Sequence, residues 1–294
     1  MIPTYGQEQY IGEAVRSAQA IDYPDLEIVI ADDASPDATR EVVAPLLDRR
    51  TRYHRNETNL GRVGNYHNTA HNVVSGEWLI NLDGDDYFTS SSFITDAMDA
   101  VARLDDPDIV GYCYRHPNID EIISLIPYTA VDDNRIVVSG KDYLLNYDKV
   151  GRFAHLSTIF RRDVGLRIGM YTLPWQACDF HSAIRIFLTG KIILDRRSVG
   201  YWRRHGANTT TVEADDKYRQ AMLTYDAIEE FAKDYIPDTL LKEWRPRMNR
   251  AVRRDYIRNH VWSVGNFKSA YLLLAYPSMH WWWWRAWVRL LSGR

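Results

Sequence analysis

Four residues of the sequence place three carboxylates in a single turn. Asp83-Gly84-Asp85-Asp86 directly follows residues 78–82, an apolar run with the composition of a buried strand. Carboxylates this close repel one another, and a bound cation relieves the repulsion. Because every candidate ligand here is an oxygen, Mg²⁺ or Mn²⁺ suits the turn, with phosphate oxygens and water completing the shell. The alternative is a solvated acidic turn, since Asp-Gly pairs are common at turns.

Two further polar clusters stand where other strands are expected to end. Pro3, Thr4 and Tyr5 lie near the start of the chain, and Asp32-Asp33 follows the apolar, β-branched residues 26–31. Helical periodicity separates these segments, and strands that alternate with helices indicate a mostly parallel sheet. In such sheets ligands bind beyond the carboxyl ends of the strands, where all three clusters fall. We therefore expect the clusters to converge on one site.

The elements that must position these residues follow from hydrophobic periodicity and capping signals. Strands are expected at residues 26–31, 53–55, 78–82, 108–114, 135–138, 155–160, 191–194 and 199–202. Helices are expected at residues 7–20, from Pro36 onward with Ser35 as N-cap, at 63–74, at 139–145 with Ser139 as N-cap, and at 180–188. Beyond about Asp215 the pattern is helical. The expected organisation is an α/β domain over residues 1–215 and a helical C-terminal region over residues 216–294.

Two segments of the second half also carry candidate chemistry. Asp179 follows Cys178 and precedes an apolar helix, so one interpretation makes it the N-cap of that helix. Residues 201–210 place Arg203, Arg204 and His205 together, which suits contact with phosphate or metal. The alternative for the second segment is a basic surface loop.

Composition limits the classes of function. The 294 residues carry a net charge of −3, which gives no overall electrostatic case for binding nucleic acid. Cys113 and Cys178 are too few for a disulfide framework and fit a reducing compartment. Neither a signal peptide nor an uninterrupted apolar stretch of about 18 residues is present, so a cytoplasmic protein is expected.

The C-terminal tail combines tryptophan with arginine over residues 280–291. Tryptophan favours the membrane–water interface and arginine favours anionic headgroups, so an in-plane amphipathic helix is one interpretation. It would make the protein peripheral at the inner face of the cell membrane. A helix buried against the domain, or an oligomer contact, is the alternative.

Taken in order, these segments resemble the family 2 glycosyltransferases. The resemblance rests on Ile2-Pro3-Thr4-Tyr5, on residues 29–39, on Asn59-Leu60-Gly61 and on residues 76–86, and it extends from residue 1 to about 210. It implies a GT-A fold, in which a mostly parallel central sheet is flanked by helices. It also implies an inverting, metal-dependent transfer of a sugar from a nucleoside-diphosphate donor, with the UDP type favoured. The acceptor would be a glycan or a lipid-linked saccharide.

The resemblance implies a role for each matching position in the first half. Pro3, Thr4 and Tyr5 would lie at the nucleobase. One carboxylate of Asp32 and Asp33, with Asp32 slightly favoured, would bond the base or the ribose. Asp83 and Asp85 would form the Asp-x-Asp pair, which contacts the ribose and the Mn²⁺ or Mg²⁺ ion that bridges the diphosphate.

In the second half the resemblance places Asp179 at the base that deprotonates the acceptor hydroxyl. Cys178 stands where relatives carry a glutamate, so whatever orients the base differs here. Arg203 and Arg204 would meet the diphosphate, and His205 would be a further metal ligand. We also expect His155 and Trp175 to line the acceptor or sugar pocket, because aromatic faces suit sugar rings.

Two rival functions remain open, and the start of the chain departs from the family pattern. A nucleotidyltransferase would carry a Gly-rich, basic phosphate loop after the first strand. It is disfavoured because the residues there, Gly6-Gln7-Glu8-Gln9, include no basic residue. A non-catalytic nucleotide-sugar-binding or scaffold protein draws support from Cys178. Only Met1 and Ile2 precede the Pro-Thr-Tyr element, whereas relatives have several apolar residues there, which indicates a truncated or misassigned start.

Overall fold

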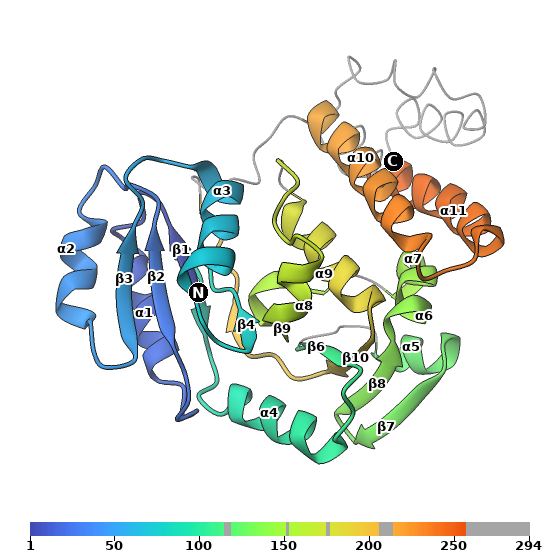
Figure 1. Cartoon of the computed structure of the whole chain (residues 1–294), viewed down its shortest axis with the longest axis horizontal. Helices are drawn as coiled ribbons and strands as arrows, with labels where there is room; N and C mark the ends of the chain where they lie inside the picture. The colour runs from blue at the N-terminus through green and yellow to red at the C-terminus, as the bar shows by residue number, and fades with distance from the viewer. Residues whose placement is uncertain (115–118, 151–152, 175–176, 206–213, 257–294) are drawn as a thin grey trace, which may run out of the picture.

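The first sheet brings the N-terminal polar clusters to one edge. The computed structural model describes residues 1–114, 119–150, 153–174, 177–205 and 214–256, and these form an α/β fold (Figure 1). Strands β1 (Ile2–Thr4), β2 (Ile28–Asp32) and β3 (Thr51–Arg55) pair in parallel in the order β1–β2–β3. All five residues of β2 are buried, as expected for a central parallel strand.

Helices connect and cover these strands. They are α1 (Ile11–Gln19), α2 (Thr39–Val43), the 3₁₀ turn η1 (Ala44–Leu46), α3 (Gly61–Asn68) and the π-helical turn η2 (Thr69–Val73). The apolar face of α1 packs with Ile30 of β2 and Val43 of α2 in one buried cluster. Val29 of β2 instead packs in a second buried cluster with Tyr66 and Ala70, so β2 contributes to both cores.

The second sheet is mixed. Its order is β4–β9–β6–β10–β8–β7, and only β6 and β10 pair in parallel. Its strands are β4 (Trp78–Ile80), β6 (Ile109–Cys113), β7 (Tyr128–Asp132), β8 (Arg135–Ser139), β9 (Thr158–Arg161) and β10 (Lys191–Asp195). The α/β class is confirmed, and its parallel pairs are confined to β1–β2–β3 and β6–β10.

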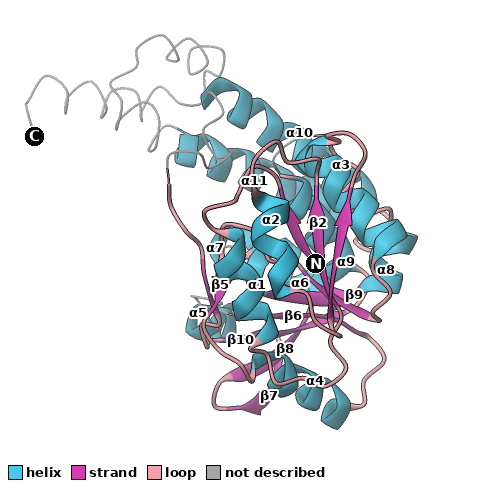
Figure 2. Cartoon of the chain, turned by 90° about the vertical axis from the view of Figure 1, so that its left-hand side faces the viewer, coloured by secondary structure: helices cyan, strands magenta, loops and turns pink. Residues whose placement is uncertain are grey.

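Backbone hydrogen bonds join the two sheets between β1 and the segment that begins at β4. The amino group of Met1 donates to the Ile80 carbonyl at 2.8 Å, and the Leu82 amide donates to the Met1 carbonyl at 3.0 Å. The Gly84 amide then donates to the Pro3 carbonyl at 3.1 Å. In Figure 2 the strands near β2 stand upright while β6 and β9 cross the view. This junction sets the acidic turn beside Pro3, Thr4 and Tyr5.

The remaining elements surround the second sheet and extend beyond it. They are β5 (Tyr87–Phe88), which pairs with β11 (Gly200–Tyr201), and α4 (Phe93–Leu104), α5 (Ile119–Leu125), α6 (Gly140–Leu145), α7 (Tyr147–Val150), η3 (His155–Ser157), α8 (Arg162–Arg167), α9 (Cys178–Leu188), α10 (Ala214–Ala232) and α11 (Asp238–Tyr256). Within the described residues no helix is long and apolar enough to cross a membrane.

The two last helices form a hairpin on the main body. Helix α10 packs along α9 and against α11. Trp244 of α11 is fully buried, and its indole Nε1 donates to the Leu144 carbonyl at 2.8 Å. The change to helical periodicity near Asp215 therefore coincides with the start of α10, while the division into domains at residue 215 stays a prediction. The Trp- and Arg-rich tail lies outside the described residues.

Two expected boundaries are wrong for local reasons. The helix after β2 begins at Thr39 and not at Pro36, because the Ser35 hydroxyl donates to Asp32 and accepts from the Gly6 amide instead of capping a helix. Residues 155–157 form a 3₁₀ turn, so β9 begins only at Thr158. The helix over residues 140–145 is confirmed, with Ser139 accepting from the Lys141 amide at its N-cap.

Candidate active site

The carboxyl ends of β1, β2 and β4 open onto one cavity of about 580 Å³. This volume lies within the range of pockets that enclose small ligands and cofactors. The expected residues that line it are Pro3, Thr4, Tyr5, Asp33, Asp83, Asp85, His155, Asp179 and His205. The three polar clusters therefore meet as expected, and Asp179 joins them from α9. Trp175 lies outside the described residues.

Asp33, and not Asp32, lies on the wall of the cavity. Asp32 is fully buried and binds groups of the protein: its carboxylate accepts from the Ser35 amide and hydroxyl, from the Tyr53 hydroxyl and from Arg55. Consecutive side chains of an extended strand point to opposite sides, which explains why only one of the pair reaches the cavity. The structure thus corrects the preference for Asp32.

Asp33 is held in place by one of its two oxygens. Its Oδ1 accepts from Asn56 Nδ2 and from the Leu60 amide, each at 2.8 Å. Tyr5, which follows the neighbouring strand β1, is about half exposed, at 49%. A carboxylate and an exposed aromatic face at one end of the cavity suit a planar heterocycle with hydrogen-bonding edges.

The acidic turn is packed so tightly that its second residue has to be glycine. A Cβ on Gly84 would lie 2.4 Å from Gln7 Oε1 and 2.9 Å from Thr4 Oγ1. Asp83 Oδ1 accepts from the Tyr66 hydroxyl and, at 2.8 Å, from Asn81 Nδ2. Asp83 therefore has a fixed orientation on the cavity floor.

Asp86 differs from the other two acids of the turn. It is buried, and the Arg203 amide donates to its Oδ1 at 2.9 Å. Burial raises the pKa of Asp86 to about 8, and the nearby Asp83 and Asp85 charges add to the increase. Near neutral pH Asp86 is therefore mostly protonated, which lowers the repulsion within the turn.

Asp85 of the acidic turn and His205 contact each other, and both line the cavity. His205 Nε2 lies 2.9 Å from Asp85 Oδ2, and its ring stacks on Tyr10 with centroids 4.6 Å apart. A carboxylate oxygen and an imidazole nitrogen are both metal donors. Within the described chain no cluster of three His, Cys, Asp or Glu side chains is arranged to hold a metal. The two donors fit an ion that takes its remaining ligands from a diphosphate and water.

The two arginines next to His205 do not line the cavity. Arg203 lies behind the acidic turn, where its Nε donates to the Asp85 carbonyl at 2.9 Å and its guanidinium pairs with Glu13. Arg204 is exposed and lies over the ring of Trp202, 5.1 Å from its centroid. In this arrangement neither arginine is placed to contact a diphosphate in the cavity. Trp202, next to them in the sequence, does line the cavity.

Arg62 is the cavity cation that the sequence does not reveal. It follows Gly61, whose φ of +73° turns the chain into α3, and its guanidinium lies 5.2 Å from the Tyr66 ring centroid. Arg62 Nη2 lies 3.8 Å from Cys178 Sγ. Burial acts to lower the pKa of Arg62, but the electrostatic effects of Tyr66 and Cys178, and then of Asp179 and Asp83, raise it overall. Cys178, at the position where the resemblance implies a glutamate, thus faces the guanidinium of Arg62.

Asp179 sits in the first turn of α9 and lines the cavity. The helix begins at Cys178 with Ala177 as its cap residue, so Asp179 is not the N-cap. Its Oδ1 accepts from the Phe180 amide at 2.7 Å. A carboxylate that faces the cavity from this position is placed to accept a proton from a bound hydroxyl.

His155 lines the cavity, where the charges of Asp179 and Asp83 act on its ring. Its Nε2 is 2.9 Å from the Tyr171 hydroxyl, and its Nδ1 is 3.4 Å from Asn81 Nδ2. Because the Asn81 amide nitrogen is a donor, Nδ1 accepts and the proton is on Nε2. Burial lowers the pKa of His155, which keeps the ring neutral.

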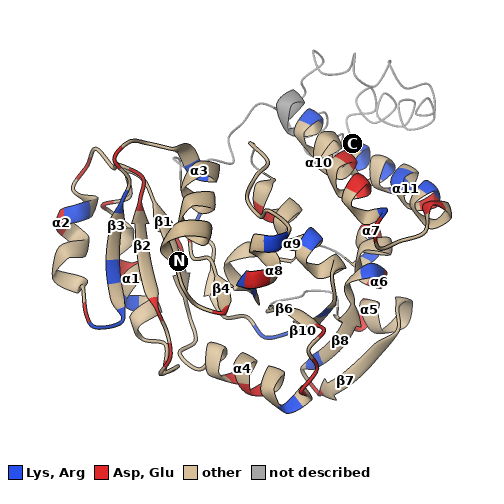
Figure 3. Ribbon diagram, in the orientation of Figure 1, with Lys and Arg blue, Asp and Glu red and all other residues tan. Residues whose placement is uncertain are grey.

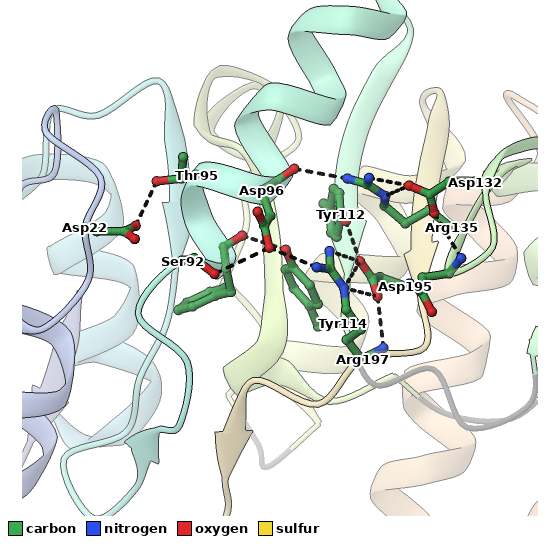
Figure 4. Close-up of polar contacts among 12 residues, drawn as sticks. Asp22, Ser92, Thr95, Asp96, Tyr112, Tyr114, Asp132, Arg135, Asp195 and Arg197 are labelled. Carbon is green, nitrogen blue, oxygen red and sulfur yellow. Dashed lines mark hydrogen bonds and ion pairs between the residues drawn. The ribbon is translucent and has the colours of Figure 1, made fainter.

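A buried ionic network positions the strand that carries the basic segment. Asp195 is fully buried at the end of β10, and it accepts from Tyr112 at 2.6 Å and from Arg197 at 2.8 Å (Figure 4). Arg197 also bonds Asp96 of α4 at 2.8 Å. These bonds fix the chain between β10 and β11, and β11 leads directly to Trp202, Arg203 and His205.

Comparison with known proteins identifies the family. The model of Glycosyl transferase family 2 matches residues 1–165, and the chain belongs to this family. Poly(ribitol-phosphate) beta-N-acetylglucosaminyltransferase TarS of Staphylococcus aureus is 32% identical over 109 residues, which are 36% of this chain and 18% of that protein. GalNAc(5)-diNAcBac-PP-undecaprenol beta-1,3-glucosyltransferase of Campylobacter jejuni is 36% identical over 98 residues, 32% of this chain and 31% of that protein.

The fold has a close match among solved structures. The crystal structure of Staphylococcus aureus TarS in complex with UDP-GlcNAc superposes with a TM-score of 0.66 at 18% sequence identity, covering 91% of this chain and 76% of that chain. The GT-A fold is thereby confirmed. The chain spans less than a third of the length of each of the two curated relatives above.

Proposed function

We propose that this protein is an inverting glycosyltransferase that moves a sugar from a nucleoside-diphosphate donor to an acceptor hydroxyl. The observation that carries the proposal is the single cavity that holds Asp33, Asp83, Asp85 and Asp179 together. Membership of the family supports sugar transfer, and the cavity supplies a place for each part of the donor.

The nucleotide would bind across the strand ends. Tyr5 would stack on the base, Asp33 would accept from its edge or from the ribose, and Asp83 would bond the ribose. A UDP-type donor is favoured, because the TarS structure of matching fold was crystallised with UDP-GlcNAc. Asp85 and His205 would hold Mn²⁺ or Mg²⁺ against the diphosphate. When bound, that ion would stabilise the negative charge that develops on the leaving group.

Asp179 would act from the opposite wall as the general base. Its carboxylate would take the proton of the acceptor hydroxyl while the hydroxyl oxygen attacks the anomeric carbon. The bond from that carbon to the phosphate oxygen breaks, its electron pair leaves with the nucleoside diphosphate, and the anomeric configuration inverts. Arg62 would supply a positive charge near Asp179 in the absence of the family's glutamate.

The acceptor that we propose is a glycan or a lipid-linked saccharide, in the assembly of a surface polysaccharide or glycoconjugate. The relatives that support this setting act on a poly(ribitol-phosphate) and on an undecaprenol-linked saccharide, according to their names. A non-catalytic binding protein is the rival proposal, and Cys178 is the residue that favours it.

Asp179→Asn tests the proposal. We expect the release of UDP from a UDP-sugar to fall by about 10²- to 10⁴-fold, while UDP affinity stays within about twofold. Asp163→Asn is the matched control, because Asp163 is an exposed aspartate of α8. Unchanged turnover in Asp179→Asn would contradict the assignment of the base. Binding of UDP without turnover of any donor by the native protein would favour the rival.

A further inference from the structure

The chain is electrostatically asymmetric along its length. Residues 238–294 carry eleven Lys and Arg against three Asp and Glu, whereas residues 1–237 carry 25 against 36. The net charge of −3 is therefore the sum of a basic C-terminal part, residues 238–294, and an acidic part, residues 1–237. Such a separation of charge indicates binding to an anionic partner. Of this basic part, the structure describes α11.

One side of α11 is committed to the protein core. Leu241, Trp244, Met248 and Tyr256 are buried at helical spacing. Two arginines flank this buried side and are neutralised there: Arg245 pairs with Asp226 and Glu229 of α10, and Arg247 pairs with Asp148 of α7 at 2.8 Å. These contacts fix the rotation of α11 about its axis.

The other side of α11 carries three exposed cations. Lys242, Arg250 and Arg254 are exposed and lie eight and four residues apart, which places them on one side of the helix. Within the described residues none of the three takes part in an ion pair. Glu243 is the one exposed acid between Lys242 and Arg254. Figure 3 shows that basic residues recur along α11.

The sequence that follows α11 indicates what kind of anionic partner fits. Residues 257–294 contain five Lys and Arg, no Asp or Glu, and six of the ten tryptophans of the chain. Cations interleaved with tryptophan are typical of segments that bind the membrane–water interface, whereas nucleic-acid binding needs no such density of tryptophan. We propose that the basic face of α11, defined as Lys242, Arg250 and Arg254, docks the protein on an anionic lipid surface. This inference does not depend on the proposed sugar transfer.

Vesicle binding of the full chain tests this inference. The triple variant Lys242→Gln/Arg250→Gln/Arg254→Gln removes the face, and Arg40→Gln/Arg49→Gln/Lys141→Gln removes three exposed cations elsewhere. We expect the partition coefficient on phosphatidylcholine vesicles with about 30% phosphatidylglycerol to fall at least about tenfold in the first triple and less than about twofold in the second. Binding by the native protein should weaken as salt rises.

Three results would overturn the proposal. They are equal binding by the native protein and the first triple, an equal loss in both triples, and native binding to pure phosphatidylcholine that is as strong as to the anionic vesicles. Because all six side chains are exposed, thermal unfolding midpoints should not change, which separates loss of docking from loss of fold. Donor hydrolysis in solution should also be unchanged in the first triple, whatever the outcome for the proposed transfer.

Discussion

His205 Nε2 lies 2.9 Å from Asp85 Oδ2, although the two residues are 120 positions apart in the sequence. The contact joins the acidic turn after β4 to the basic segment after β11. The contact places a carboxylate oxygen and an imidazole nitrogen, two different kinds of metal ligand, at the same point of the cavity. The proposed binding of a metal and a nucleoside-diphosphate sugar depends on this contact.

His205→Ala is therefore expected to raise the Mn²⁺ concentration that gives half-maximal activity by at least about tenfold, because one of two protein ligands is lost. Asp85→Asn should have an effect of the same direction. His54→Ala on β3 is the control, since His54 does not line the cavity. Manganese titration of UDP release measures the change, and a response in His205→Ala like that of the control would remove His205 from the site.

Asp32, the last residue of β2, and Asp33, which follows it, should respond differently to the same conservative change. Asp33→Asn keeps an oxygen for Asn56 and Leu60, so the fold should persist while UDP affinity falls about tenfold or more. Asp32→Asn leaves Tyr53 and Arg55 facing an amide, and we expect the free energy of unfolding to fall by about 2–4 kcal/mol. Urea unfolding and UDP titration of both variants check this pair, and the reverse assignment of effects would contradict it.

His155 should influence donor binding through Asn81 and not by direct contact alone. His155→Phe breaks the link between Asn81 and Tyr171, and we expect KM for the donor to rise about two- to tenfold. His155→Gln restores a polar group and should recover part of the loss. Steady-state kinetics over donor concentration distinguishes the two. No difference between Phe and Gln at this position would mean that the hydrogen bonds have no role.

His181 should make the fold sensitive to acid. It is buried, its Nδ1 has no hydrogen-bond partner among the described residues, and burial lowers its pKa to about 4, with a smaller effect from Arg185. Below pH of about 6.5 the unfolded chain binds a proton that the folded chain does not, so stability falls with pH until about pH 4. The expected loss is roughly 2–3 kcal/mol across this window.

His181→Phe keeps a similar volume and removes this titration. Urea unfolding at about pH 7 and pH 5 should show a smaller loss of stability on acidification in the variant than in the native protein. The carboxylates of the fold titrate in both proteins, so only the difference between them is informative. Parallel curves for the two proteins would show that folding does not lower the pKa of His181.

The convergence of the polar clusters could be predicted in part from topology. Residues 3–5 and 32–33 had to meet because β1 and β2 pair in parallel, whereas the acidic turn joins them through backbone bonds between β1 and the segment that begins at β4. Which aspartate of Asp32-Asp33 faces the cavity was not predictable, because it depends on the phase of β2 at its last residue. The wrong start of α2 has the same origin, since Ser35 serves Asp32 and not the helix.

Other parts of the site depend on contacts that sequence periodicity does not encode. Arg62 lines the cavity from α3, and Tyr171 contacts His155 from a loop position. Neither stands in a local motif, so their positions come from packing alone. Arg203 follows the expected motif yet turns behind Asp85 and Asp86, because Glu13 and the Asp85 carbonyl bind its guanidinium. A motif thus locates a segment, whereas the surrounding side chains decide where each member points.

Calorimetric titration of UDP into the native protein, with Mn²⁺ and then with EDTA, tests most directly whether the acidic turn binds a divalent ion together with a diphosphate. We expect binding in Mn²⁺ that weakens by at least about 100-fold in EDTA, and the same weakening in Asp85→Asn with Mn²⁺ present. UDP affinity that is equal in Mn²⁺ and EDTA would contradict the metal-assisted site. So would an Asp85→Asn variant that binds UDP as the native protein does.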